Sequence, residues 1–99
     1  MSFNLIAEAD TPIDWGRLLA SLRPIHPGVE CFPIPSDLGG GVQALGISLL
    51  TGKKPEPTWE GFVVVAERLW MAGMRVFELY SGTEVTPDSL ANVQQMFLG

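Results

Sequence analysis

The sequence predicts one small mixed α/β domain with the element order β-α-β-β-α-β and a further helix at the C-terminal end. Three observations predict it: two helical stripes of apolar residues, proline-marked helix starts, and apolar runs of strand length between them. A length of 99 residues suits a single core, so we expect residues 1–99 to form one domain. With 46% hydrophobic and 17% charged residues, the composition is that of a globular chain.

The first strand and first helix are predicted from alternation and from helix-start residues. From Phe3 to Ala9, apolar residues alternate with a period near two, which is typical of a strand. Thr11 is the expected N-cap of the helix, and Pro12 suits its first position. The helix is expected to end before Pro24, because the residue before a proline is pushed out of the α region. One apolar stripe is formed by Trp15, Leu18, Leu19 and Leu22.

Two strands are predicted next, from Val29 to Ile34 and from Val42 to Leu50. Pro33 cannot donate a hydrogen bond to a neighbouring strand, so the first of them is expected at a sheet edge. The second has few polar residues, which favours a central position covered on at least one face. Gly46 within it indicates a β-bulge. The segment from Pro35 to Gly41 between the strands is expected to be a loop.

The second helix is predicted from Thr58 to Ala72, after a loop from Thr51 to Pro57. Gly73 suits the left-handed residue that ends many helices. Val64 and Val65 lie off the main apolar stripe, so the helix is apolar over more than half of its circumference. The sequence therefore predicts either deep burial of this helix or contact with a partner.

The last strand is predicted from Met74 to Ser81, and a last helix begins with Thr86 as N-cap and Pro87 at its first position. The charges of Arg75 and Glu78 suit a second sheet edge, because charged edges discourage unwanted pairing. The resulting order is that of the ferredoxin-like fold, with helices on one face of the sheet plus a C-terminal helix. That fold places its second and fourth strands at the edges of the sheet. The sequence has Pro33 in the second predicted strand and the charges of Arg75 and Glu78 in the fourth.

Composition limits the expected partners and location. The net charge of -5, from 11 acidic and 6 basic residues, repels phosphate backbones, so no nucleic-acid partner is expected. The longest apolar run, from Phe62 to Ala66, is far shorter than the roughly 18 residues of a membrane helix, so no membrane partner is expected. A single cysteine and an N-terminal segment without a basic region favour a cytoplasmic location.

Three groups of residues are candidates for chemistry, and each has a plainer interpretation. His26 and Cys31 form a potential base and nucleophile, but no third orienting group is evident and an inert buried thiol is favoured. Glu8 and Asp10 are carboxylates at a strand end, where solvation explains them. The Gly39–Gly41 run favours a flexible hairpin loop over an anion site, because a predicted strand follows it instead of a helix and no Lys-Ser or Lys-Thr pair follows. No cofactor or metal is expected.

The favoured hypothesis is a small non-catalytic protein-binding module, of the kind that acts as an immunity or antidote inhibitor of a larger protein. Its partner is expected to be a basic protein or a second copy of the chain. One alternative is a regulatory domain that senses a small ligand, and another is a small enzyme that uses His26 and Cys31. The predicted interface lies on the second helix and consists of Trp59, Glu60, Val64, Glu67 and Met71.

Overall fold

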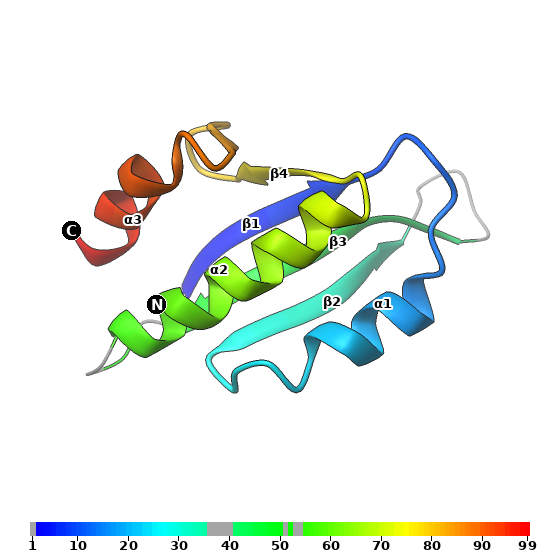
Figure 1. Ribbon diagram of the computed structural model, residues 1–99, viewed down its shortest axis with the longest axis horizontal. Helices are drawn as coiled ribbons and strands as arrows, with labels where there is room; N and C mark the ends of the chain where they lie inside the picture. The colour runs from blue at the N-terminus through cyan, green and yellow to red at the C-terminus, as the bar shows by residue number, and fades with distance from the viewer. Residues whose placement is uncertain (1, 36–40, 51, 53–54) are drawn as a thin grey trace.

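Within residues 2–35, 41–50, 52 and 55–99, which the computed structural model describes, five strands form one antiparallel sheet accompanied by three helices (Figure 1). The mixed α+β class expected from the sequence is therefore confirmed. In chain order the elements are β1 (Ser2–Glu8), α1 (Trp15–Leu22), β2 (Val29–Pro35), β3 (Val42–Leu50), α2 (Pro55–Met71), β4 (Arg75–Glu78), β5 (Glu84–Val85) and α3 (Leu90–Leu98).

The strand order is β2-β3-β1-β4-β5, and each neighbouring pair is antiparallel. Two predictions are confirmed: β2, which contains Pro33, lies at an edge, and β3 lies inside the sheet with residues 44–49 buried. The prediction that the fourth strand forms the other edge is wrong, because β5 pairs with it through Val76 and Val85. This fifth strand makes the sheet differ from a simple βαββαβ arrangement.

Gly46 marks a close contact between β2 and β3, and the bulge expected there is absent from the described strand. Gly46 pairs regularly with Ile6 on one side and with Phe32 on the other. A Cβ atom at this position would collide with the Phe32 ring, which lies over the glycine. The register shift lies instead between Ile34 and Pro35, at the end of β2.

The first helix begins later than predicted. Thr11 and Pro12 precede α1, whose N-cap is Asp14. The Asp14 carboxylate accepts a hydrogen bond from the backbone N–H of Arg17 at 3.2 Å. This bond satisfies one of the N–H groups that lack a partner in the first helical turn, so the helix begins at Trp15.

The start of the last helix was also predicted too early. The Thr86 N–H donates to the Ser89 hydroxyl at 2.8 Å, and the Ser89 N–H donates to the Thr86 hydroxyl at 3.2 Å. These reciprocal bonds hold residues 86–89 in a turn, and α3 begins only at Leu90. The sequence signal of Thr86 and Pro87 therefore marks this turn, not the first turn of the helix.

The second helix ends at Met71, one residue before the predicted Ala72, and the predicted left-handed Gly73 is confirmed. Gly73 follows α2 with a φ of 81°, a conformation that glycine adopts at little cost. Its N–H donates to the Trp70 carbonyl at 2.9 Å, and the Met74 N–H donates to the Leu69 carbonyl at 3.0 Å. This pair of bonds is the Schellman arrangement. At its other end α2 begins at Pro55, one turn earlier than predicted, where a proline needs no N–H partner.

Helices α1 and α2 cover one face of the sheet, and α2 lies between α1 and α3 (Figure 1). Because α2 has neighbours on three sides, most of its apolar residues are buried within the chain. Val65, which lies off the main apolar stripe, is 0% exposed, so of the two predicted alternatives deep burial holds for this residue. Other fully buried core residues include Leu5, Ile47, Phe62 and Leu69.

Candidate functional site

Four of the five residues predicted for a protein interface lie on one exposed side of α2. Glu60, Val64, Glu67 and Met71 are separated by four, three and four residues, which places them along a single helix face. All four are exposed, and the exposed fraction reaches 41% for Val64 and 88% for Met71. We call these four residues the outer face of α2.

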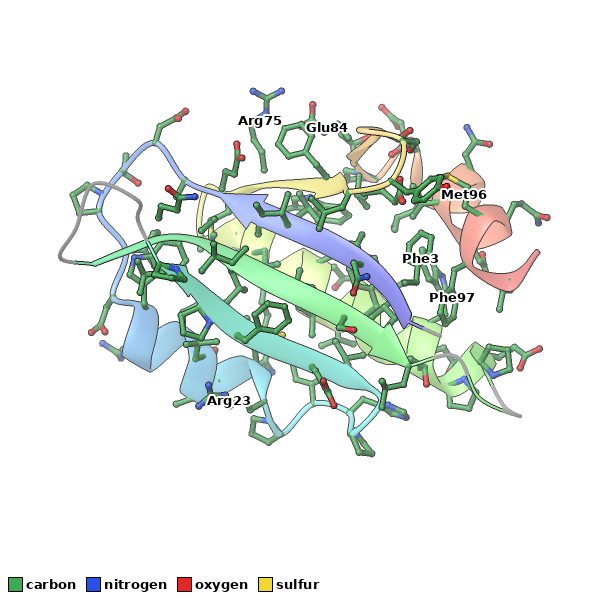
Figure 2. The ribbon with its side chains drawn as sticks, turned by 180° about the vertical axis from the view of Figure 1, so that it is seen from behind. Phe3, Arg23, Arg75, Glu84, Met96 and Phe97 are labelled. Atoms are coloured by element: carbon green, nitrogen blue, oxygen red, sulfur yellow. The ribbon has the colours of Figure 1, made fainter. Side chains whose placement is uncertain are left out.

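Trp59, the fifth predicted residue, lies in the interior. It is 5% exposed and packs against Phe62 and Phe97, with ring-centroid distances of 5.2 and 5.9 Å. Phe97 belongs to α3, and its ring also meets that of Phe3 edge-on at 5.5 Å. Figure 2 shows Phe3 and Phe97 together at the end of the sheet beside α3. The structure therefore separates Trp59 from the outer face of α2.

The outer face of α2 is acidic as well as apolar. Its carboxylates are those of Glu60 and Glu67, and Glu56 lies exposed in the first turn of the same helix. Arg68 is the single basic residue of α2, and its guanidinium donates to the Ser21 carbonyl of α1 at 3.0 Å. The bond directs the Arg68 guanidinium toward α1, and the helix keeps an excess of carboxylates over basic groups. A basic partner with an apolar centre would complement this surface.

His26 and Cys31 line the same shallow hollow of about 340 Å³. No hydrogen bond joins them in the described part of the chain. The His26 Nδ1 atom accepts the Gly28 N–H at 2.9 Å, so it is already occupied. Burial raises the pKa of the Cys31 thiol to about 11, although the nearby Arg23 guanidinium lowers it slightly. A protonated thiol is a poor nucleophile.

The structure adds no support for chemistry at the remaining candidate groups. Glu8 and Asp10 are exposed, and the described residues contain no group of three or more histidine, cysteine or acidic side chains able to hold a metal ion. Most of the Gly39–Gly41 loop lies outside the described residues.

Across the described ranges, no helix has the length and apolar character needed to cross a bilayer.

Comparison with known proteins found no matching family model, no similar curated protein and no similar solved structure. Function must therefore be inferred from side chains and their geometry.

A second exposed apolar surface, which the sequence did not predict, lies where β4 ends beside α3. Leu79 is 55% exposed, Tyr80 is 99% exposed and Met96 is 42% exposed. With Phe3, Asn4 and Glu78 they line a hollow of about 370 Å³. We call these six residues the Tyr80 corner. Its sequence signal was weak: Met96 lies off the apolar stripe of α3, and Ser81-Gly82 marks a turn after Tyr80.

Glu78 fixes the backbone of this corner. Its side chain is 2% exposed, and its Oε1 atom accepts the Tyr80 N–H at 2.8 Å. The Oε2 atom accepts both the N–H and the hydroxyl of Ser81. Burial alone would raise the pKa of this carboxyl group, but the hydrogen bonds from Ser81 and Tyr80 lower it below its ordinary value. The predicted edge charge is therefore a buried anchor for the turn after β4.

Proposed function

We propose that this chain is a non-catalytic protein-binding module that binds a basic partner through the outer face of α2. We further propose that it acts in the cytoplasm as an immunity or antidote inhibitor of a larger protein. We also propose that its sheet is a ferredoxin-like sheet extended by β5. The observation that carries the proposal is Met71, whose apolar side chain is 88% exposed on the same helix face as Glu60 and Glu67.

The outer face combines two kinds of contact that favour association. Burying the Val64 and Met71 side chains against a partner would contribute up to about 1.5–3 kcal/mol each. The carboxylates of Glu60 and Glu67 would attract a basic surface and speed the encounter. The catalytic alternative has less support, because the Cys31 thiol is buried and the His26 Nδ1 atom is bonded to Gly28.

The proposal is tested by reversing the charge of the outer face. The chain and its E60K/E67K variant would each be used to capture partners from cells, and the captured protein would then be purified for calorimetry. We expect the double variant to bind at least about ten-fold more weakly, with a slower association rate at low salt. The matched control is E8K/E30K, because Glu8 and Glu30 are also exposed but lie on the sheet.

Two results would contradict the proposal. One is that the purified partner binds E60K/E67K as tightly as the original chain. The other is that E8K/E30K weakens binding by the same factor, because the attraction would then depend on net charge and not on α2.

A further inference from the structure

The Tyr80 corner presents an aromatic side chain on a rigid turn. Three hydrogen bonds to the buried Glu78 carboxylate hold the backbone of Tyr80 and Ser81 in place. The Ser81 hydroxyl also lies 2.8 Å from the Thr83 hydroxyl, and the Glu78 N–H donates to the Thr83 carbonyl at 2.8 Å. Tyr80 is nevertheless 99% exposed, so the turn holds a large amphipathic ring in solvent.

A hollow lies directly beside this exposed ring. Its apolar walls are Phe3, Leu79 and Met96, and its volume is about 370 Å³. Glu78 is the one charged residue among the described residues that line it, and both of its oxygens are already bonded within the turn. Because the Glu78 side chain is only 2% exposed, the hollow offers a mainly apolar surface to an incoming group, with Asn4 as its other polar residue.

Few exposed charges lie around the corner, because its one charged residue, Glu78, is 2% exposed. From residue 79 to residue 99 the charged side chains are those of Glu84 and Asp88, in a sequence with a net charge of -5. Glu84 is paired with Arg75, with 2.9 Å between Nη2 and Oε1. Two copies of an acidic chain repel each other least where neither exposes an unpaired charge. Interface cores are likewise depleted of charge and enriched in Tyr, Phe and Met.

The shape of the corner also favours a second copy. A two-fold dimer brings the same patch of both chains together, so that patch must be complementary to itself. The corner meets this requirement because it combines a protruding ring, Tyr80, with an adjacent hollow walled by Met96 and Phe3. We propose that two copies of this chain associate through the Tyr80 corner, each placing its Tyr80 ring in the hollow of the other.

The association is tested on the purified chain alone, by sedimentation velocity from micromolar to millimolar concentration. We expect the average mass to rise from the 10.7 kDa of one chain toward twice that value. Y80A and M96E should each weaken the association at least about ten-fold, because Y80A removes the aromatic anchor and M96E adds an exposed charge to a mainly apolar hollow. Both residues are exposed, and circular dichroism would verify that the variants remain folded.

The matched control is M71A, which removes an even more exposed methionine from the outer face of α2. It should dimerise like the original chain. The proposal is overturned if the original chain stays monomeric throughout the concentration range, or if M71A weakens the dimer as much as Y80A. A monomeric chain whose melting temperature rises with small aromatic compounds would assign the hollow to a ligand instead. No outcome depends on the basic partner of α2, because that partner is absent from the experiment.

Discussion

The indole ring of Trp59 stacks on the phenyl ring of Phe97, with 5.9 Å between the ring centroids and 25° between the ring planes. Phe97 also contacts Phe3 edge-on, so this one side chain joins α3 to both α2 and β1. No charged residue in α3 assists in this attachment, because the helix contains none. The position of α3, and with it that of Met96 in the Tyr80 corner, therefore depends on apolar packing, in which the Phe97 ring is joined by Val93 at 0% exposure.

Replacing Phe97 with alanine should destabilise the chain by about 3–5 kcal/mol, the usual cost of deleting a buried phenyl ring. Because the Phe97 side chain is only 8% exposed, contact with water offsets little of this loss of stability. Urea denaturation followed by circular dichroism would measure the change. The neighbouring L98A variant is the control, and because Leu98 is 38% exposed its loss should cost under about 1 kcal/mol. Equal costs for the two variants would show that α3 is not held by the Phe97 ring.

The buried Glu78 carboxyl group should make stability depend on pH in the acid range. Its pKa is lowered in the folded chain, so below its ordinary value of 4.5 the unfolded chain binds more protons than the folded chain. The stability due to this shift is fully present above the ordinary pKa and is lost as the pH falls through the lower folded value. Urea denaturation at several pH values would show this loss.

The E78Q variant should lose that acid dependence and cost about 1–3 kcal/mol at neutral pH, because a buried amide cannot accept all three hydrogen bonds. E60Q is the control, since Glu60 is exposed on α2, and it should change stability by less than about 0.5 kcal/mol. If E78Q kept the full acid dependence of the original chain, another carboxyl group would have to be responsible.

The Cys31 thiol should react slowly while the chain is folded. With its pKa raised by burial from 9.0 to about 11, the thiolate is scarce near pH 8. Alkylation by iodoacetamide should therefore be about a hundred-fold slower in the folded chain than in urea. Mass spectrometry of quenched samples would give both rates, with C31S as the unlabelled control. Rapid alkylation of the folded chain would revive the hypothesis of an enzyme that uses Cys31.

Local signals in the sequence were sufficient where one residue decides the structure. Pro33 cannot donate to a neighbouring strand, and β2 is an edge strand. Gly73 favours a left-handed backbone, and α2 ends there. The N-cap of α1 was wrongly assigned to Thr11, because threonine and aspartate both cap helices and only the bond from the Arg17 N–H to the Asp14 carboxylate shows which residue does so.

Contacts between distant segments could not be predicted from local patterns. Glu78 looked like an edge charge, because its hydrogen-bond partners in Tyr80 and Ser81 face it only after the turn has formed. Trp59 looked available for a partner, because nothing in the sequence placed α3 beside the start of α2. Glu60, Val64 and the rest of the outer face needed only helical spacing, which explains why that part of the predicted site stays together.

At Gly61, helix propensity and packing predict opposite effects of an alanine substitution on the stability of the chain. A glycine inside a helix costs about 0.8–1 kcal/mol relative to alanine, so propensity alone predicts that G61A stabilises the chain. A Cβ atom at Gly61 would, however, lie 2.6 Å from the Cβ atom of His26 and 3.4 Å from a Val29 methyl group. A Cβ atom is fixed to the backbone, so the loop at His26 would have to move.

Overpacking of this kind costs about 1–3 kcal/mol, which exceeds the gain in propensity, so G61A should destabilise the chain by up to about 2 kcal/mol. The matched control is G16A in α1, where a Cβ atom would approach nothing closer than an Asp14 carboxylate oxygen at 3.9 Å. There the gain should remain, and stability should rise by about 0.4–1 kcal/mol. Urea denaturation of the two variants would decide the question, because a stabilising G61A would mean that α2 does not lie against His26 as closely as the structure places it.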